Sequence, residues 1–412
     1  MRTILVAALL ATVPAMASAE PLRFEDALDR AAIDGPSLEA DRLEIEARRT
    51  AATTAGQWPD PKLGVSIENF PISGPPAFSL TGDDMTMARI GLSQEVPSSA
   101  RRLARIGEAA AGIAEAEATQ AVSLREAQIA AGVAWVDLAF AEQRLGAVDA
   151  AINRLSAYSD TGAAGVASGT VRPAETIETK AAIAQLHDMR AEITAERARA
   201  RASLSRLTND PDPAAVGPLP HMEIDPNELR ASIGELPQVS LADARLQQAR
   251  SGIALATAEK RPDWMFDVAY EKRAPAYGDM VSLGVTVSLP LFSSRRQDPL
   301  IASRLTASNA AAARREDIRR SLAAELEASL ADHVMHHEQW ERARDTLLPL
   351  AQQRAELEVA SYAAGRASVQ DVVAARTATV EAELLVLERE AEVVRDAVRI
   401  NLTFGGQAHG SH

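Results

Sequence analysis

The sequence contains no cysteine, so it can form neither a disulfide framework nor a thiolate metal site. Beyond residue 19 it also has no apolar run approaching the ~20 residues that a membrane-spanning helix needs. Any part of the mature chain that enters a membrane must therefore do so through β-strands. A nucleophile elbow, a phosphate loop and a recognisable pair of catalytic carboxylates are also missing, so we expect no enzymatic activity and no cofactor.

Positive charge is in short supply. The chain has 43 Lys and Arg against 57 Asp and Glu, a net charge of −14. An acidic balance argues against binding nucleic acid and favours cationic or neutral solutes as the traffic nearby.

The N-terminus has the features of an export signal. Met1-Arg2 precedes an apolar run from Ile4 to Val13, and Ala17-Ser18-Ala19 forms a small-residue cleavage site. We interpret residues 1–19 as a secretory signal peptide, because the run is too short for a membrane anchor. The mature chain would begin at Glu20, where no cysteine offers a site for lipid attachment.

The chain is predicted to consist of two similar halves, residues 20–220 and 221–404, followed by a flexible His-containing tail at 405–412. Three landmarks recur in the same order in both halves. They are "WPDPKLGVSIENF" (58–70) with "RPDWMFDVAYE" (261–271), "MARIGLSQEVPSSARR" (87–102) with "MVSLGVTVSLPLFSSRR" (280–296), and "AAGVAS" (163–168) with "AAGRAS" (363–368). A repeat of this length is far longer than a solenoid unit.

Four segments alternate between apolar and polar residues, which predicts strands with two different faces. They are residues 62–70, 85–96, 263–272 and 279–289. Each has about the length that a tilted strand needs to cross the hydrocarbon layer. We expect the small and polar face to be wet and to line a lumen with Glu68, Arg89, Asp267, Ser282 and Thr286.

The rest of the chain is predicted to be mainly helical. A heptad pattern of apolar residues continues from Leu103 to Leu155 and predicts a coiled-coil seam. A second long helix is expected at 295–362, where ~68 residues would span ~100 Å. Shorter returning helices are expected at 174–208 and 369–403, each after a Gly-containing turn.

Four strands cannot close a barrel, and an open sheet edge cannot lie in lipid. Three copies of the chain would supply twelve strands, within the range of outer-membrane barrels. Two alternatives remain: amphipathic hairpins packed on a soluble core, and a secreted coiled-coil adaptor protein. The adaptor explains the helices but leaves four strands of membrane-spanning length without a role.

Taken together, the signal, paired hairpins, similar halves and long helices resemble the TolC-like outer-membrane efflux channel family. The segment 68–97 looks most like the heavy-metal cation efflux branch, with Met85-Met87 and then Gly91–Gln94 before a proline. It departs from that branch at 99–102, which reads Ser-Ala-Arg-Arg where Gly-Lys-Arg is common, and in lacking a lipidated cysteine.

The resemblance implies a homotrimer with a twelve-stranded β-barrel continued by a helical periplasmic barrel. It implies a passive exit duct in the outer membrane of a Gram-negative envelope, extending into the periplasm. The partners would be a periplasmic adaptor protein and an inner-membrane pump of the RND type, with heavy-metal cations as cargo. Efflux of drugs or organic solutes, and type I secretion, are alternatives within the same fold.

In that family the helix-turn-helix tips form the closed entrance and dock the adaptor. The motif match places these tips at Gly165, Ser168, Gly365 and Ser368. Ordinary Gly-punctuated turns are the alternative reading.

The family's entrance also carries an acidic ring, which the match places at Asp371, with Glu175 as a possible counterpart in the first half. Tyr362 and Arg366 are candidates for the bonds that hold the entrance shut. Alternatively, Asp371 is a helix-start carboxylate favoured by the helix dipole.

One histidine cluster, "HVMHH" (333–337), has weak metal-binding potential, since His333 and His337 lie one helical turn apart. Both lie on an apolar stripe, which favours a packed or hydrogen-bonded pair instead. The terminal "HGSH" (409–412) is a weaker signal still.

Overall fold

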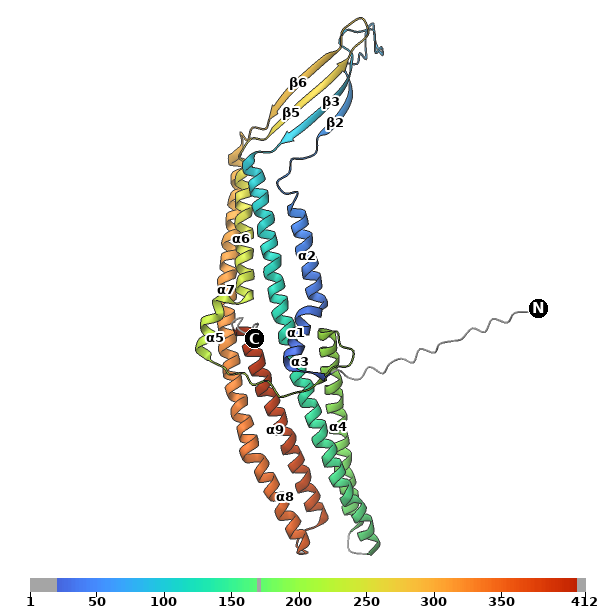
Figure 1. The fold of residues 1–412 in the computed structure, drawn as a ribbon, viewed down its shortest axis with the longest axis vertical. Coiled ribbons are helices and arrows are strands. Elements are labelled where there is room, and N and C mark those ends of the chain that lie inside the picture. The colour runs from blue at the N-terminus through green and yellow to red at the C-terminus, as the bar shows by residue number, and fades with distance from the viewer. Residues whose placement is uncertain (1–20, 169–171, 406–412) are drawn as a thin grey trace, which may run out of the picture. The chain divides into compact units, whose positions relative to one another are not determined.

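The computed structural model describes residues 21–168 and 172–405. The predicted signal peptide and residues 406–412 of the tail lie outside the described residues. Helices dominate the chain (Figure 1). The elements, in chain order, are β1 (Pro21–Leu22), α1 (Phe24–Asp34), α2 (Pro36–Ala52), β2 (Lys62–Glu68), β3 (Met87–Val96), α3 (Ser99–Ser168), α4 (Pro173–Thr208), β4 (Ala214–Ala215), α5 (Pro226–Ser232), a 3-10 turn (Ile233–Glu235), α6 (Pro237–Ala258), β5 (Trp264–Lys272), β6 (Met280–Val287), a 3-10 turn (Ser293–Arg295), α7 (Gln297–Arg342), a π-helical turn (Ala343–Leu347), α8 (Leu348–Ala363) and α9 (Val369–Phe404).

The chain divides into two compact units. Of the described residues, one unit contains 21–38, 123–168, 172–233 and 323–405, and the other contains Glu39–Val122 and Gly234–Leu322. Among the described residues, no helix combines the length and the apolar character needed to cross a membrane.

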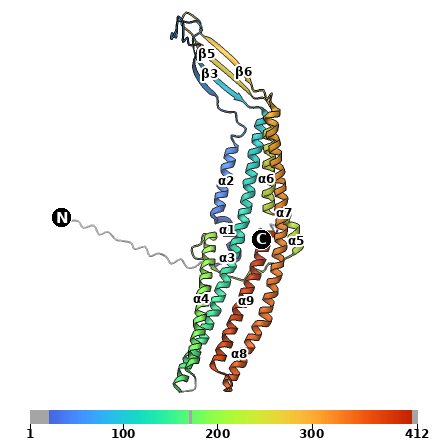
Figure 2. The same ribbon diagram turned by 180° about the vertical axis from the view of Figure 1, so that it is seen from behind.

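The second unit contains a four-stranded antiparallel sheet in the order β2-β3-β5-β6 (Figures 1 and 2). Each strand lies within one of the four predicted segments and is shorter than predicted by one to three residues. The central pairing joins β3 to β5, with Arg89 opposite Glu271 and Val96 opposite Trp264. The sheet therefore combines one hairpin from each half of the sequence.

The first unit has its core around Trp135 of α3, whose side chain is 1% exposed. The indole Nε1 donates a hydrogen bond of 2.8 Å to the carbonyl oxygen of Leu22, and the Phe24 ring packs edge-on at 5.6 Å. Leu22 belongs to β1, which pairs in parallel with β4. A buried tryptophan places its N–H against a backbone acceptor because an unpaired polar group would be costly there.

The predicted seam along α3 is buried in its second part only. Leu138 and Val148 are fully buried, and they lie in clusters with residues of α4 and α9. At the start of the helix, Leu103 is 68% and Ile106 is 47% exposed. Helix α2 ends at Ala52, and within one chain the first part of the seam is exposed, so the predicted coiled-coil contact there stays a prediction.

The second long helix extends over 297–363, close to the predicted 295–362, but it contains a π-helical turn. Arg295 lies in the 3-10 turn before α7, and a π-helical turn at Ala343–Leu347 separates α7 from α8. Pro349 follows this turn and has no N–H to donate to the carbonyl one turn earlier, where its ring would also clash. The wider turn accommodates the proline without breaking the helix. In both ribbon views α8 and α9 lie side by side (Figure 2).

Candidate functional site

The sheet has one polar face, and the predicted lumen residues lie on it. In an antiparallel ladder, residues directly opposite one another point to the same face. Glu68 is opposite Met87, Ser282 is opposite Ala269, and Thr286 is opposite Met265. With Arg89 and Asp267, these residues therefore lie on one face of the sheet, across all four strands.

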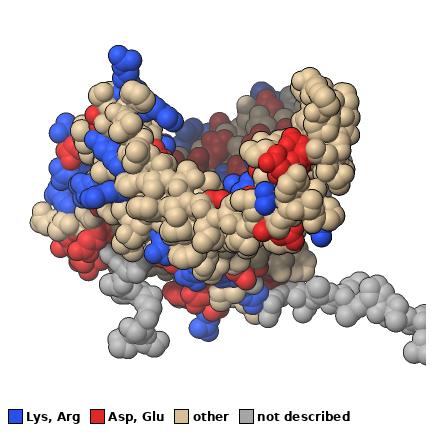
Figure 3. Space-filling view, turned by 90° about the horizontal axis from the view of Figure 1, so that it is seen from above, with Lys and Arg blue, Asp and Glu red and all other residues tan. Residues whose placement is uncertain are grey.

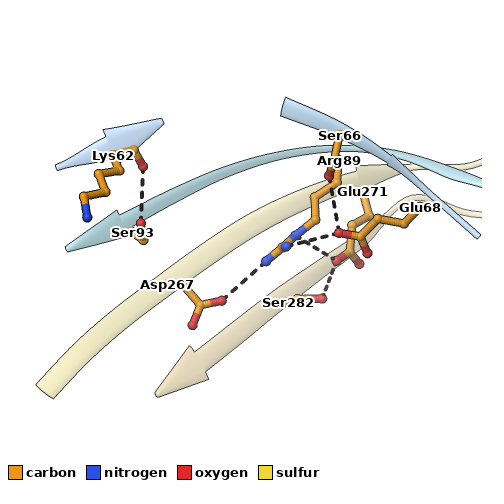
Figure 4. A network of polar contacts seen from close by, with 8 residues as sticks. All are labelled: Lys62, Ser66, Glu68, Arg89, Ser93, Asp267, Glu271 and Ser282. Carbon is orange, nitrogen blue, oxygen red and sulfur yellow. Dashed lines mark hydrogen bonds and ion pairs between the residues drawn. The ribbon is translucent and has the colours of Figure 1, made fainter. Parts of the chain in front are cut away.

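Arg89 is the centre of a charged cluster on this face (Figure 4). Its guanidinium lies 3.1 Å from Glu68 Oε1 and 3.4 Å from Asp267 Oδ1. Its Nε lies 3.7 Å from Oε1 of Glu271, which in turn accepts a 2.7 Å hydrogen bond from the Ser282 hydroxyl. Arg89 thus connects β3 to β2 and β5, and Glu271 extends the cluster to β6 through Ser282.

The cluster holds three carboxylates around one guanidinium, which leaves an excess of negative charge. Glu271 is the most enclosed, with its side chain 7% exposed, whereas that of Arg89 is 31% exposed. Glu271 was not among the predicted lumen residues, although it alternates in phase with Asp267 along the strand, which was the signal that could have identified it.

Two glycines leave room for this arrangement. Gly284 lies opposite Asp267, and a Cβ atom at position 284 would lie 2.0 Å from Asp267 Oδ2. Gly91 lies opposite Ala269, where a Cβ atom would lie 3.3 Å from the alanine Cβ. Both glycines come from the matched landmarks of the two halves.

The other face of the sheet is apolar and uncovered. Leu63, Val65, Leu283 and Val285 are 69%, 77%, 82% and 58% exposed. Within the described part of the chain, β2 and β6 each pair on one side only. An exposed apolar face and two open edges indicate a surface that another molecule or a lipid phase covers.

Asp263 connects the sheet to the start of α3. Its carboxylate accepts a 2.8 Å hydrogen bond from the backbone N–H of Ser98 and forms an ion pair with Arg101. Its own N–H donates to the Ser288 hydroxyl at 2.9 Å. The matching residue of the first half, Asp60, is exposed, so the matched Pro-Asp pairs differ in their surroundings.

The turn between α8 and α9 is built by its own sequence. Gly365 has a φ of +69°, and the N–H of Arg366 donates to the carbonyl of Ser361 at 2.8 Å, which closes α8. Ser368 then begins α9 with a capping box: its hydroxyl accepts from the N–H of Asp371, whose carboxylate accepts from the N–H of Ser368 at 2.8 Å.

The Asp371 carboxylate also accepts a 2.7 Å hydrogen bond from the Ser368 hydroxyl. These bonds hold the pKa of Asp371 below its usual value. Within one chain, Asp371 is therefore a capping carboxylate at the start of α9, as the alternative interpretation of the sequence expected. Tyr362 and Arg366 are exposed, and no described residue serves as a polar partner of either side chain. Their predicted role in closing the entrance stays a prediction.

The corresponding turn of the first half lies partly outside the described residues, which omit 169–171. Gly165 and Ser168 belong to the last part of α3, and Glu175 belongs to the first turn of α4. Their side chains are outside the description, so their predicted roles stay predictions.

The histidine cluster lies on α7. The rings of His333 and His337 are 6.3 Å apart, and His337 packs against Trp340. Burial lowers the pKa of His333. Among the described residues, no group of three or more His, Asp and Glu side chains could hold a metal ion. His336, which the sequence analysis did not single out, is the residue that pairs with Asp396, at 2.7 Å.

A groove of about 940 Å³ lies between α3, α4 and α9. Charged pairs cross it: Arg144 with Glu196 at 2.7 Å, and Arg395 with Asp137 at 3.3 Å. Burial raises the pKa of Asp137, although the nearby Arg395 opposes that shift. The heptad pattern did not reveal this groove, since it records only apolar positions.

Charges of both signs are interspersed over the surface seen in Figure 3. The net negative charge of the chain is thus not gathered into a single acidic face in that view. Local clusters such as the one around Arg89 are therefore more informative about function than the total charge.

Comparison with known proteins identifies a family model for part of the chain. The model described as "Outer membrane efflux protein" matches residues 230–406. This range corresponds closely to the second predicted half. No curated protein matches the sequence.

Solved structures match nearly the whole chain. A membrane protein from Pseudomonas aeruginosa has a TM-score of 0.79 at 15% identity, covering 93% of this chain and 90% of its own. The CmeC outer membrane channel of Campylobacter jejuni has a TM-score of 0.77 at 14% identity, with coverages of 93% and 85%. The MtrE outer membrane channel of Neisseria gonorrhoeae, in its open state, has a TM-score of 0.75 at 16% identity, with coverages of 93% and 89%. The chain thus has the fold of outer-membrane channels, and residues 230–406 match the outer membrane efflux protein model.

Proposed function

We propose that the chain is the outer-membrane channel of a tripartite efflux system and forms a homotrimer. The sheets of three chains form a twelve-stranded barrel, and the helices continue the duct into the periplasm. Solutes leave passively through it, and an inner-membrane pump of the RND type supplies the driving force. The fold comparisons support this role, and the sheet gives it a physical basis.

One observation carries the proposal: the sheet has an exposed apolar face, a charged face, and two unpaired edges. In lipid every backbone N–H and C=O must be paired, so an open edge cannot remain there. Pairing β6 of one chain with β2 of the next satisfies both edges at once. The apolar face then meets hydrocarbon, and the face with Arg89 meets water.

The lumen face favours cations as cargo, and we propose heavy-metal cations. The Arg89 cluster contributes three carboxylates for one guanidinium per chain, and such an excess attracts cations. Met87, Met265 and Met280 lie on the same face of the sheet as this cluster. Their thioether groups are soft donors, which suit soft metal ions better than organic solutes.

The turn at 364–368 is the proposed docking site for a periplasmic adaptor. Gly365 and Ser368 shape a compact turn, in which Arg366 is exposed, and Tyr362 is exposed just before it. Gly165 and Ser168 would contribute the second tip. In a trimer, three copies of Asp371 near one axis would form an acidic entrance ring, with Glu175 as a possible second contributor.

Disulfide trapping tests the assembly directly, because the natural chain contains no cysteine. Cysteines introduced singly along β2, at Leu63, Val65 and Ile67, are combined with single cysteines along β6, at Val281, Leu283 and Val285. Oxidation of at least one combination in native membranes should give a ladder that ends at trimer on a non-reducing gel. Cysteines at Leu92 and Val268 in the two central strands are the control and should remain monomeric.

A second measurement tests the duct. The purified protein should require detergent and should conduct ions with cation preference in planar bilayers. A stable, detergent-free monomer that does not conduct would contradict the proposal. Efflux of silver or copper(I) against that of a hydrophobic dye, in cells carrying the matching pump, distinguishes metal from organic cargo.

A further inference from the structure

We propose that a surface patch beside the sheet binds the anionic headgroups of a phospholipid leaflet. The patch consists of Leu289, Leu291, Phe292, Arg295 and Arg296, and we call it the junction patch. It follows β6 directly in the chain and ends at the start of α7. The inference rests on the proposed function, since it requires that the sheet lie in a membrane.

The two halves differ at the first arginine of each matched pair, whereas Arg102 of the first half is half-buried and its Nε has no hydrogen-bond partner among the described residues. In the first half, Arg101 is half-buried and forms an ion pair with Asp263. In the second half, Arg295 and Arg296 are exposed, and no described residue pairs with either guanidinium. The guanidinium groups of Arg295 and Arg296 are therefore free to bond an external anion.

Apolar residues lie immediately beside these charges. Leu289, Leu291 and Phe292 are 64%, 76% and 68% exposed. They continue the apolar face of β6, where Val285 is 58% exposed, toward the arginines. Trp264, opposite Val287 in the ladder, adds an exposed aromatic ring to the same face. Aromatic rings of this kind favour the boundary between hydrocarbon and water.

Local acidic groups do not neutralise the patch. Asp298, the nearest carboxylate in the sequence, is paired with Lys260. Arg261, just before β5, is also exposed and has no polar partner among the described residues. The junction patch is therefore locally cationic although the whole chain has a net charge of −14.

An exposed apolar segment followed by unpaired arginines matches the layers of a phospholipid leaflet. The apolar side chains enter the acyl region, and the guanidinium groups bond phosphate oxygens at the headgroup level. A leaflet rich in anionic lipid is preferred over a zwitterionic one, because it attracts each arginine electrostatically. The patch would fix the depth at which the sheet lies in the membrane.

Quenching by brominated lipids tests the inference. The full-length protein is reconstituted into vesicles that contain dibrominated phosphatidylglycerol or dibrominated phosphatidylcholine, and tryptophan fluorescence is measured. The chain has four tryptophans, so the same measurement on Trp264→Phe is subtracted, and the difference reports on lipid beside the junction patch. The wild type should prefer phosphatidylglycerol, and Arg295→Gln/Arg296→Gln should reduce this preference by about fivefold for each arginine removed. High salt should weaken the wild-type preference, because it screens exposed charges.

The matched control is Arg250→Gln/Arg314→Gln. These arginines are also exposed and without polar partners among the described residues, but they lie within helices α6 and α7. The control should retain the wild-type preference. Equal quenching by both lipids in the wild type, or an unchanged preference in Arg295→Gln/Arg296→Gln, would overturn the inference.

Conductance measured on the same vesicles separates the two proposals. Vesicles that conduct but show no lipid preference would contradict the lipid site and leave the channel proposal supported. A reconstituted protein that shows the lipid preference but does not conduct would support the patch and count against the channel.

Discussion

Gly284 lies directly opposite Asp267 in the β5–β6 ladder, and the missing side chain provides the space that the Asp267 carboxylate occupies. Asp267 in turn lies 3.4 Å from the guanidinium of Arg89. A glycine that the sequence shows only as a landmark therefore helps to shape the charged face.

Gly284→Ala should displace the Asp267 carboxylate and alter ion selectivity while leaving stability almost unchanged. Replacing a strand glycine by alanine stabilises the folded state by about 0.5–1 kcal/mol, because the unfolded chain loses flexibility. Loss of a partly exposed ion pair costs about 0.2–1 kcal/mol, which offsets that gain. Reversal potentials in bilayers and the melting temperature of the detergent-solubilised protein provide the measurements.

Gly64→Ala is the matched control for that variant, because a Cβ atom at position 64 would meet nothing within 4 Å. It should leave selectivity unchanged. If both alanine variants alter selectivity equally, the space opposite Asp267 is not the cause.

Arg89→Gln should lower stability and make the conductance more cation-selective. The change leaves three carboxylates without their shared cation, and Glu271 is only 7% exposed. Leaving a buried polar group without its partner costs about 1–3 kcal/mol. The thermal unfolding temperature should fall accordingly.

Arg89→Gln/Glu271→Gln should recover part of that stability, since the second change removes the enclosed charge. Recovery in the double variant separates an electrostatic cause from simple loss of packing. A double variant that is less stable than Arg89→Gln alone would show that the cluster is not the relevant unit.

Asp371→Asn should reduce cation selectivity if three Asp371 side chains form the proposed entrance ring, because the ring loses its charge. Ser368→Ala is the matched variant, since it weakens the cap by about 1 kcal/mol but keeps the carboxylate. Planar-bilayer reversal potentials should therefore change in Asp371→Asn and remain unchanged in Ser368→Ala. Unchanged reversal potentials in Asp371→Asn would assign Asp371 to capping alone.

The cap on α9 should resist moderate acid and fail in strong acid. The hydroxyl and the backbone N–H of Ser368 hold the pKa of Asp371 below its ordinary value of 3.8. A lowered carboxyl pKa stabilises the folded turn fully above the ordinary value, and this contribution is lost as the pH falls through the lowered value. Hydrogen exchange at residues 368–372, corrected for the intrinsic rate, should rise only below that range. A rise near pH 5 to 6 would contradict this assignment.

Much of the fold was predictable because its signals are local. Period-two alternation placed the strands within a few residues, and helical periodicity with Gly-containing turns placed α4 and α9 almost as observed. The π-helical turn before Pro349 was missed, because apolar periodicity records which face is buried and not how the backbone accommodates a proline.

Site residues were harder to predict than strands. Alternation placed Glu68, Arg89 and Asp267 on one face, but it could not show that Arg89 lies within ion-pair distance of all three carboxylates. That depends on the β3–β5 register, which joins residues 178 positions apart. The roles of Asp263 and Asp60 differ for the same reason, although the two sequences around them are alike.

By itself the sequence determined the period of each element, the two faces of each strand and the turn at Gly365, because each depends on residues close together in the chain. Only the tertiary structure decided which side chains share a cluster, which of the matched arginines forms an ion pair within the chain, and which strand edges are left unpaired. These depend on strand register and helix neighbours, where a shift of one residue would carry Arg89 to the opposite face.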